Sequence, residues 1–271
     1  MRYSILDPTG NITALVEDAV PAKDQPAVAA QIMERHPNVE QVGFVRFEAS
    51  SWGGQDVQAS LRMAGGEFCG NASMCAASLY AVRTGWAGHA VWLGVCGASE
   101  AVRVTLSGDE REGFETSIQM PEARSVRLER LVWQRVAGEV PVVHLEGISH
   151  AVLEPCSPFF GLRREPSEAE RAVREWCACL GADGLGLMFV EDGAWAQKSL
   201  TPLVYVPGSD TVFWEHSCAS GSAAVGMYYL AQTKMPVDLH LREPGGMLRV
   251  EGDVASGRVT LHGHVRFVKR G

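Results

Sequence analysis

Two short segments place a cysteine beside small residues and in front of an alanine-rich stretch. The first, Cys69-Gly70-Asn71-Ala72-Ser73, leads into residues 74–83, and the second, Cys218-Ala219-Ser220-Gly221-Ser222, leads into residues 223–232. Both stretches are apolar almost all the way round at helical spacing, so each helix must be wrapped on every side. The sequence therefore predicts two buried helices, each preceded by a cysteine.

A cysteine at the start of a helix is suited to acid–base chemistry. It faces unpaired backbone N–H groups and the positive end of the helix dipole, which stabilise a thiolate and lower a thiol pKa below its usual value of about 8.5. The same N–H groups bind carboxylates. Gly70, Ala72, Ala219 and Gly221 leave the backbone open to a small anionic ligand.

Two such cysteines facing one cleft would form a near-mirror pair of acid–base groups. One thiolate removes the α-proton of an amino acid from one face, while the opposing thiol delivers a proton to the other face. With each sulfur about 3 to 3.5 Å from the carbon, the sulfurs would lie roughly 6 to 7 Å apart, and the helix N-termini would stabilise the enolate-like carbanion. The sequence predicts no cofactor, because it contains neither a glycine-rich nucleotide loop nor a lysine typical of a pyridoxal-phosphate site.

The elements that position the cysteines recur in two halves. In the first half, a turn at residues 7–11 precedes a helix that starts at Asp24 and stops before Pro37, then a strand at residues 39–48. In the second half, a turn at residues 147–150 precedes a helix that starts at Ser167 with a capping box and stops near Gly181, then a strand at residues 185–191.

Hairpin strands follow each cysteine helix, at residues 102–106 with 116–120 and at residues 247–250 with 259–268. The repeat predicts an α+β fold of two pseudo-symmetric lobes, each a barrel-like, mostly antiparallel sheet around a central apolar helix. The N-terminal lobe, residues 1–124, carries Cys69. The C-terminal lobe, residues 125–271, carries Cys218, and its last strand is free to pack on the first lobe.

Composition excludes several other classes of protein. The 271 residues include 24 Lys and Arg against 32 Asp and Glu, a net charge of −8, which disfavours binding to nucleic acid or to an anionic membrane. The most apolar run, residues 89–98, is shorter than the ~20 residues of a spanning helix, and residues 1–20 lack a signal-peptide core. We expect a cytoplasmic protein whose seven cysteines are reduced.

The two cysteine motifs resemble those of the diaminopimelate epimerase family of pyridoxal-phosphate-independent amino-acid racemases and epimerases. The turn Asp7-Pro8-Thr9-Gly10-Asn11 is similar to that family's N-terminal glycine-asparagine turn, and Gly147-Ile148-Ser149-His150 is similar to its Gly-Asn-Pro-His turn. The resemblance spans essentially the whole chain. It implies two lobes, a thiol and thiolate mechanism and a homodimer.

Roles for individual residues follow from the resemblance. It implies that Cys69 and Cys218 are the base and the acid, and that Asn11 and His150 line the site. It also implies that backbone N–H groups hold the α-carboxylate at Asn71, Ala72, Gly221 and Ser222.

Departures from the family pattern concern the substrate side chain. An asparagine expected before the first cysteine is missing from residues 62–66, the Glu-Arg-Gly segment before the second is replaced by residues 212–217, and Ile148 stands for another asparagine. A distal zwitterion would lose its partners, so diaminopimelate is disfavoured. The chain is more similar to the histidine racemase branch of opine-metallophore synthesis, in which Glu48 stands where a carboxylate would accept an imidazole N–H.

Alternatives to a histidine racemase stay open. They are a diaminopimelate epimerase, an amino-acid-binding relative without chemistry, a sheet-rich interaction module, an isomerase with a carboxylate base, and a cysteine-based proline racemase. Glu48 alone is typical of a solvated strand end, and His150 of a residue bonded to its own turn. Glu215 either caps the following helix or contacts the substrate ammonium.

The remaining cysteines are interpreted without chemistry. Cys75, Cys96 and Cys156 are expected in the core. Cys177 and Cys179 are spaced to point to different helix faces, so they predict no metal or redox pair. His216 and Cys218 have no second pair at zinc spacing, so no metal is predicted. Trp176 and Trp195 are interpreted as packing residues.

Overall fold

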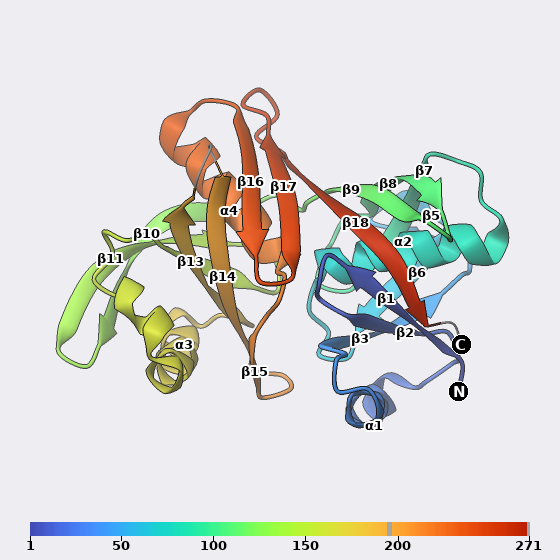
Figure 1. Cartoon of the computed structure of the whole chain (residues 1–271), viewed down its shortest axis with the longest axis horizontal. Coiled ribbons are helices and arrows are strands. Elements are labelled where there is room, and N and C mark those ends of the chain that lie inside the picture. Colours follow the sequence, from blue (N-terminus) through green and yellow to red (C-terminus); the bar gives the residue numbers. More distant parts are fainter. Residues whose placement is uncertain (194–196, 270–271) are drawn as a thin grey trace. The chain divides into compact units, whose positions relative to one another are not determined.

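The fold is that of a computed structural model, which describes residues 1–193 and 197–269 (Figure 1). The chain is mixed α/β, with four α-helices among these residues. It divides into unit 1, Met1–Met120 with Leu261–Gly271, and unit 2, residues 121–260.

Unit 1 contains a closed barrel of eight strands. Their order around the barrel is β1-β2-β3-β6-β7-β8-β9-β18, and β18 closes it by pairing antiparallel with β1, with Pro8 opposite Val265. The strands are β1 (Tyr3–Pro8), β2 (Thr13–Val16), β3 (Gln41–Arg46), β6 (Ala59–Met63), β7 (Ala90–Val95), β8 (Val102–Asp109), β9 (Gly113–Gln119) and β18 (Val259–Lys269), which starts in unit 2. The expected pairing of residues 102–106 with 116–120 is confirmed, since Leu106 lies opposite Thr116.

Helix α2 (Gly70–Thr84) contacts strands β1, β2, β6, β7, β8 and β9 of this barrel (Figure 1). It is buried along most of its length, as its apolar pattern predicts. The helix begins directly after Cys69, four residues earlier than the predicted stretch, and ends before Gly85 at φ 64°. A residue in this left-handed conformation stops the helix, and glycine adopts it without strain.

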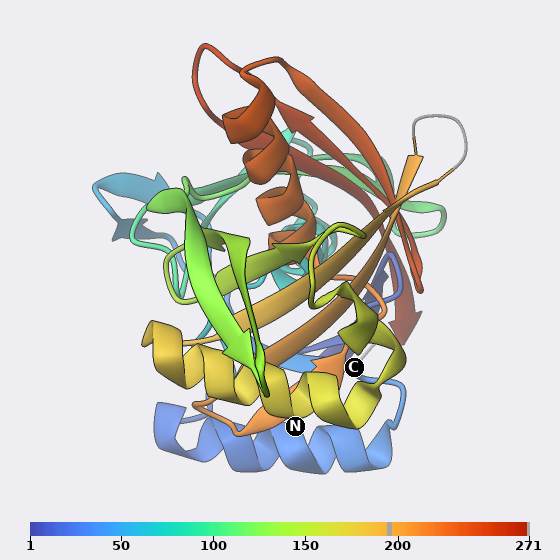
Figure 2. The same cartoon turned by 90° about the vertical axis from the view of Figure 1, so that its left-hand side faces the viewer.

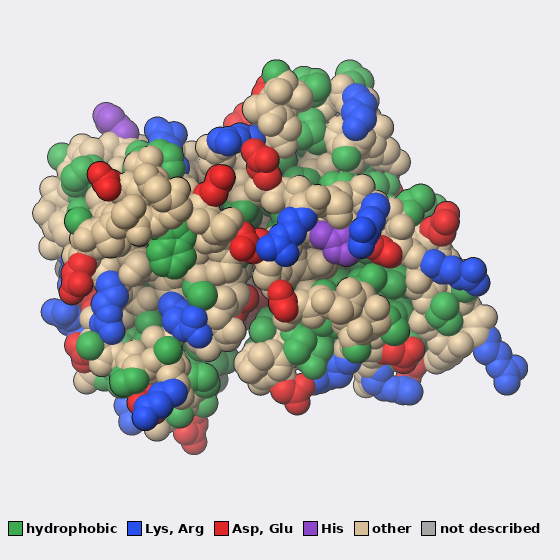
Figure 3. All heavy atoms as spheres, turned by 180° about the vertical axis from the view of Figure 1, so that it is seen from behind, with side chains coloured by type: hydrophobic (Ala, Val, Ile, Leu, Met, Phe, Trp, Pro, Cys, Tyr) green, Lys and Arg blue, Asp and Glu red, His purple; other side chains and the backbone are tan. Residues whose placement is uncertain are grey.

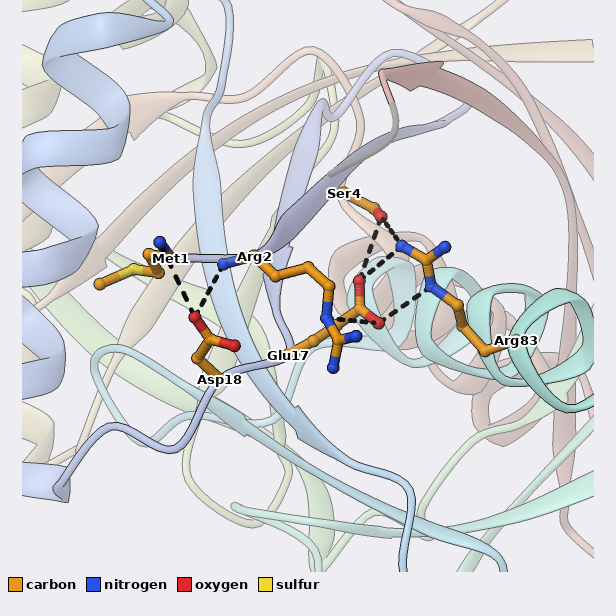
Figure 4. Close-up of polar contacts among 6 residues, drawn as sticks. All are labelled: Met1, Arg2, Ser4, Glu17, Asp18 and Arg83. Carbon is orange, nitrogen blue, oxygen red and sulfur yellow. Dashed lines mark hydrogen bonds and ion pairs between the residues drawn. The ribbon is translucent and has the colours of Figure 1, made fainter.

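An ion-pair cluster fixes the far end of α2 to the barrel (Figure 4). The guanidinium of Arg83 donates two hydrogen bonds to the carboxylate of Glu17, at 2.9 and 2.8 Å, and one to Ser4 Oγ at 3.2 Å. Arg2 adds an ion pair to Glu17 at 3.6 Å. Because the Glu17 side chain is only 3% exposed, this paired geometry is stronger than an ordinary surface ion pair.

Two smaller features complete unit 1. Helix α1 (Gln25–Arg35), preceded by the 3-10 turn η1 (Ala22–Asp24), packs on β3 and ends before Pro37 as predicted. Strands β4 (Ser50–Trp52) and β5 (Gln55–Val57) form a separate hairpin. The predicted strand at residues 39–48 is shorter, because pairing with β2 and β6 covers only Gln41–Arg46. Glu48 therefore lies in the loop after β3.

In unit 2 the strands follow the order β17-β16-β14-β13-β12-β11-β10, with β15 on β14. Helix α4 (Ala219–Thr233) contacts strands β10, β11, β12, β13, β16 and β17. The strands are β10 (Ser125–Trp133), β11 (Val136–His144), β12 (Ser149–Leu153), β13 (Leu185–Asp192), β14 (Gln197–Val206), β15 (Thr211–Trp214), β16 (Val237–Glu243) and β17 (Gly246–Gly252). As for α2, the helix starts directly after its cysteine and is apolar and buried.

Helix α3 (Pro166–Leu180), which follows the 3-10 turn η2 (Phe160–Arg164), lies on β13 and β14 (Figure 2). The predicted capping box at Ser167 is wrong: Pro166 is the first helical residue, and Glu165 caps without a side-chain hydrogen bond. Proline has the backbone angle of a first helical residue preset, so the helix starts one residue earlier. Trp176 packs in the core and donates Nε1–H to the Val132 carbonyl at 2.7 Å, whereas Trp195 lies outside the described residues.

The cysteines separate by face as the helical spacing predicts. Cys177 is buried in the α3 core and Cys179, two residues later, is exposed. Cys75 is buried in α2, but the core assignment is wrong for Cys156, which is exposed, and Cys96 is only half-buried. The turn at Cys156 leaves β12 for solvent, and an isolated cysteine in a turn has no helix or strand face to hold it inside.

Acidic and basic side chains are both scattered over the face shown in Figure 3. Within the described ranges, none of the helices has the length and apolar character needed to span a bilayer.

Candidate active site

Cys69 is the N-cap residue of α2, with extended backbone angles of φ −134° and ψ 112°. Its Sγ accepts a hydrogen bond from the backbone N–H of Ala72 at 3.3 Å. Its carbonyl accepts the N–H and the hydroxyl of Ser73 at 3.0 and 2.7 Å. The half-buried thiol therefore points at the N–H groups of the first helical turn, which is the geometry that favours a thiolate.

A chain of neutral groups connects Cys69 to the N-terminal turn. Sγ donates to Gln41 Oε1 at 3.1 Å, Gln41 Nε2–H donates to Thr13 Oγ1 at 2.9 Å, and the Thr13 hydroxyl donates to the Asn11 carbonyl at 2.9 Å. Gln41 was not identified from the sequence. An amide can accept from a thiol and, once turned about its last torsion, donate to a thiolate, so it suits either protonation state.

The N-terminal turn is built by two residues with positive φ, Thr9 at 66° and Gly10 at 100°. Asp7 Oδ1 closes the turn by accepting the Gly10 N–H at 2.6 Å. Asn11 follows and is 2% exposed. Asn11, Gln41 and Cys69 are therefore joined within unit 1 through one hydrogen-bonded chain, with Gly70, Asn71 and Ala72 buried in the helical turn beside it.

Cys218 is the N-cap residue of α4 and is 4% exposed. Its N–H donates to Glu243 Oε2 at 2.6 Å, and the Ser222 hydroxyl donates to Glu243 Oε1. Its Sγ lies 3.7 Å from Ser220 Oγ. Glu243 was not identified from the sequence, although the alternation of β16 places it on the buried side with Val237 and Leu241.

His150 lies on β12 and is fully buried. Its Nε2 is hydrogen-bonded to Ser220 Oγ at 3.0 Å, so the alternative of a histidine bonded only within its own turn is wrong. Burial lowers the pKa of His150 to about 3, which keeps the imidazole neutral. His150, Ser220 and Cys218 thus form a second chain, in unit 2.

Close packing makes Gly221 necessary in the first turn of α4. A Cβ atom at this position would lie 2.1 Å from Met188 Sδ and 3.1 Å from Cys218 Sγ. Met188 is fully buried, so its side chain would have to shift within the core to admit a Cβ atom. Ala219, Ser220 and Ser222 are buried in the same turn.

The expected lowering of the thiol pKa is wrong for Cys218. Burial first, and then the negative charges of Glu215 and Glu243, raise the pKa of this thiol well above its ordinary value, although a hydrogen bond with the Gly221 backbone lowers it. Desolvation by the surrounding unit outweighs the helix N-terminus here. Cys218 is therefore a protonated thiol.

The two other acidic residues of interest differ in exposure. Glu215 is half-buried three residues before Cys218, and its negative charge raises the pKa of the Cys218 thiol. The N-cap residue of α4 is Cys218 rather than Glu215. Glu48 is exposed in the loop after β3. Within residues 1–193 and 197–269, no group of three or more His, Cys, Asp or Glu residues is arranged to hold a metal ion.

Residues 1–271 match the family model described as the histidine racemase CntK N-terminal domain. The chain belongs to the histidine racemase family. It is an isomerase of the amino-acid racemase class. The resemblance carried by the two cysteine motifs is thereby confirmed.

Two relatives are similar along most of their length. A histidine racemase of Fusobacterium nucleatum subsp. nucleatum is 29% identical over 275 residues, which cover 98% of this chain and 94% of the relative. A histidine racemase of Staphylococcus aureus is 27% identical over 253 residues, which cover 92% of this chain and 88% of the relative.

Solved structures share the fold at lower sequence identity. A hydroxyproline epimerase from Agrobacterium vitis, with bound trans-4-hydroxy-L-proline, has a TM-score of 0.64 at 12% identity and covers 100% of this chain and 91% of its own. A PhzF-family phenazine biosynthesis protein of Bacillus anthracis has a TM-score of 0.63 at 13% identity, with coverage of 100% and 98%. At these identities the similarity concerns the fold alone.

Proposed function

We propose that the protein interconverts L-histidine and D-histidine at the α-carbon, by a two-cysteine mechanism and without a cofactor. One observation carries the proposal: in a chain of the histidine racemase family, each of two buried apolar helices begins at a cysteine in the N-cap position. Relatives named histidine racemases that match over most of the chain support the choice of substrate.

In the proposed reaction, the Cys69 thiolate removes the α-proton from one face of the substrate. The S–H bond forms as the C–H bond breaks, and the electron pair delocalises into the carboxylate. The α-carbon then takes the proton of the Cys218 thiol on the opposite face, which leaves a Cys218 thiolate. The reverse direction exchanges the two roles, as a two-base mechanism requires.

The carboxylate is proposed to bind where two helix N-termini present backbone N–H groups. These are the N–H groups at Asn71 and Ala72 on α2 and at Gly221 and Ser222 on α4. The small residues Gly70, Ala219 and Ser220 are proposed to leave the backbone accessible to the carboxylate, and Asn11 and His150 are proposed to line the site. His150 is suited to a polar lining without charge, because burial keeps it neutral.

Two acidic residues are proposed to select the substrate. Glu215 contacts its ammonium group, and Glu48 accepts an imidazole N–H. The exposure of Glu48 and its place outside β3 leave its side chain free to turn toward a ligand.

The wider setting is part of the same proposal. The protein is expected to act in the cytoplasm as a homodimer and to supply D-histidine for opine-type metallophore synthesis. We also propose two pseudo-symmetric lobes, residues 1–124 and 125–271, in which barrel-like sheets surround α2 and α4.

A chiral assay of the purified protein tests the substrate. Each common L-amino acid and diaminopimelate is incubated without pyridoxal phosphate or added metal, and the enantiomers are separated. Histidine is expected to racemise with the highest kcat/KM of the panel. A higher value for another amino acid would reject histidine, and no turnover on any of them would reject the two-cysteine reaction.

The variant Glu48→Ala tests side-chain recognition. Loss of one imidazole hydrogen bond to a carboxylate is expected to raise KM for histidine about tenfold, in the range of about 1.5 kcal/mol for a charged hydrogen bond. The variant Glu139→Gln, at an exposed position on β11, is the control. Unchanged kinetics for Glu48→Ala would show that another residue recognises the imidazole.

A further inference from the structure

We propose that Glu243 is a positioning residue that fixes the first turn of α4 and holds the proton on Cys218, so that the resting enzyme has its thiol on this side. The consequence for turnover rests on the proposed function, whereas the effect on the thiol can be measured without turnover.

The Glu243 carboxylate binds both the N-cap and the first turn of α4. One carboxylate oxygen accepts the N–H of Cys218 at 2.6 Å, and the other accepts the hydroxyl of Ser222. These donors lie at the N-cap and in the first turn, so the carboxylate fixes the backbone from which Cys218 Sγ projects. Glu243 comes from the end of β16, which contacts α4.

The Glu243 carboxylate lies near a second acidic group, that of Glu215. The groups that act on Glu243 are the backbone N–H of Cys218, the hydroxyl of Ser222 and the carboxylate of Glu215. Burial raises the pKa of Glu243 to about 8, with a further increase from Glu215. Glu243 therefore ionises before the Cys218 thiol, whose pKa is raised further.

Basic side chains on the neighbouring strands are paired elsewhere. Lys198 on β14 pairs with Asp192, and Arg249 on β17 pairs with Asp238 and Glu251.

His240, on the same strand as Glu243, lies near Asp238 at 3.9 Å, and Arg242 is exposed. Once Glu243 carries its charge, above about pH 8, a second negative charge on Cys218 is opposed at close range. The proton is consequently kept on the sulfur.

This bias has a kinetic signature. The two enantiomers have equal free energy, so kcat/KM must be the same in both directions. The individual values of kcat and KM differ between the two directions when one protonation form of the free enzyme dominates. The enantiomer whose α-proton goes to Cys69 binds that form. Replacing the carboxylate should bring the two KM values together, increasingly so as the pH rises through about 8.

The direct test is titration of the Cys218 thiol by NMR in the full-length protein with carbon-13 at cysteine Cβ, the signal being assigned by its loss in Cys218→Ser. In Glu243→Gln the midpoint of the thiol titration should fall by at least one pH unit, a tenfold change in acidity. Ser222→Ala keeps the charge and loses one hydrogen bond, so its midpoint should stay within a few tenths of the wild-type value. Glu139→Gln is the surface control.

Equal midpoints in Glu243→Gln and the wild-type protein would overturn the proposal, as would equal shifts in Glu243→Gln and Ser222→Ala, which would indicate a structural role alone. Should Glu243→Gln fail to fold, the wild-type signal decides. It is expected to show a first, smaller inflection near pH 8 as Glu243 ionises. A single inflection would contradict the coupling.

A shifted midpoint without racemisation of histidine would leave Glu243 in its role and remove only the proposed function. Racemisation of histidine with KM values that remain different for the two enantiomers in Glu243→Gln would support the proposed function and reject the role of Glu243.

Discussion

Helices α2 and α4 both begin at an N-cap cysteine, but the environments of the two cysteines differ. Cys69 is half-buried, accepts the Ala72 N–H, and is connected through amide and hydroxyl groups to Asn11. Cys218 is buried near two carboxyl groups, those of Glu215 and Glu243, and is connected through Ser220 to the neutral His150. Two N-cap cysteines on apolar helices therefore do not have equivalent chemistry, because burial and neighbouring charge decide which sulfur keeps its proton.

The largest expected effect separates both N-cap cysteines from the rest. Cys69→Ser and Cys218→Ser should each reduce kcat for histidine racemisation more than ~10²-fold, because a hydroxyl is a far weaker acid than a thiol. Cys179→Ser, on the exposed face of α3, should retain wild-type kcat. Chiral chromatography measures the loss of kcat, and thermal unfolding measures the loss of stability. Similar losses in all three variants would indicate a folding defect rather than the loss of a catalytic group.

A smaller effect is expected at the third residue after each cysteine, which is Ala72 in unit 1 and Gly221 in unit 2. Gly221→Ala should lower the free energy of unfolding by about 1 to 3 kcal/mol, since its Cβ would overlap the buried Met188. It should also reduce kcat about tenfold by displacing Cys218, a change of about 1.4 kcal/mol in the barrier.

Urea unfolding and initial rates measure both effects, and Gly221→Ala with Met188→Ala should recover part of the lost activity. The reciprocal change Ala72→Gly creates no overlap and should cost about 1 kcal/mol of stability through helix propensity. A Gly221→Ala protein as active and stable as the wild type would show that Met188 yields easily.

The effect that is smallest at neutral pH concerns acid sensitivity. His150 has its pKa lowered to about 3 in the folded protein, against an ordinary value of 6.5, so the unfolded chain takes up this proton first. Stability from this residue is nearly complete at pH 7 and is lost as the pH falls through 6.5 toward 3, by about 2 kcal/mol between pH 7 and pH 5.

In His150→Gln this loss should vanish, and urea unfolding at pH 7 and pH 5 measures it. His89→Gln, at an exposed position in unit 1, is the control and should keep the wild-type slope. A slope unchanged in His150→Gln would place the acid-sensitive group elsewhere.

Short sequence patterns predicted the buried helices and their N-cap residues, because interactions between residues close in the chain determine these features. All-round apolar character predicted α2 and α4 as buried helices, because nothing but enclosure accommodates such a surface. The paired small-residue motifs predicted N-cap cysteines, and the family resemblance followed from them. Pro166 shows the limit of a local signal, since it moved the start of α3 to one residue before the expected capping box at Ser167.

Partners from distant strands were not predictable in the same way. Gln41 is 28 residues from Cys69, and Glu243 is 25 residues from Cys218, so neither has a fixed spacing to its cysteine. Only the alternation of β16 contained a sign of the buried Glu243. The raised pKa of Cys218 was missed for this reason, because a helix N-terminus is visible in the sequence and the surrounding burial is not.

The most direct test of a two-base reaction follows the α-proton in D2O. L-Histidine is incubated with the enzyme, and the early mixture is separated into enantiomers and examined for deuterium at the α-carbon by mass spectrometry. The newly formed D-histidine should carry deuterium while the remaining L-histidine keeps protium, because one sulfur removes and the other delivers. Deuterium appearing at the same early rate in the remaining L-histidine would mean that a single group handles both faces, and would contradict the account.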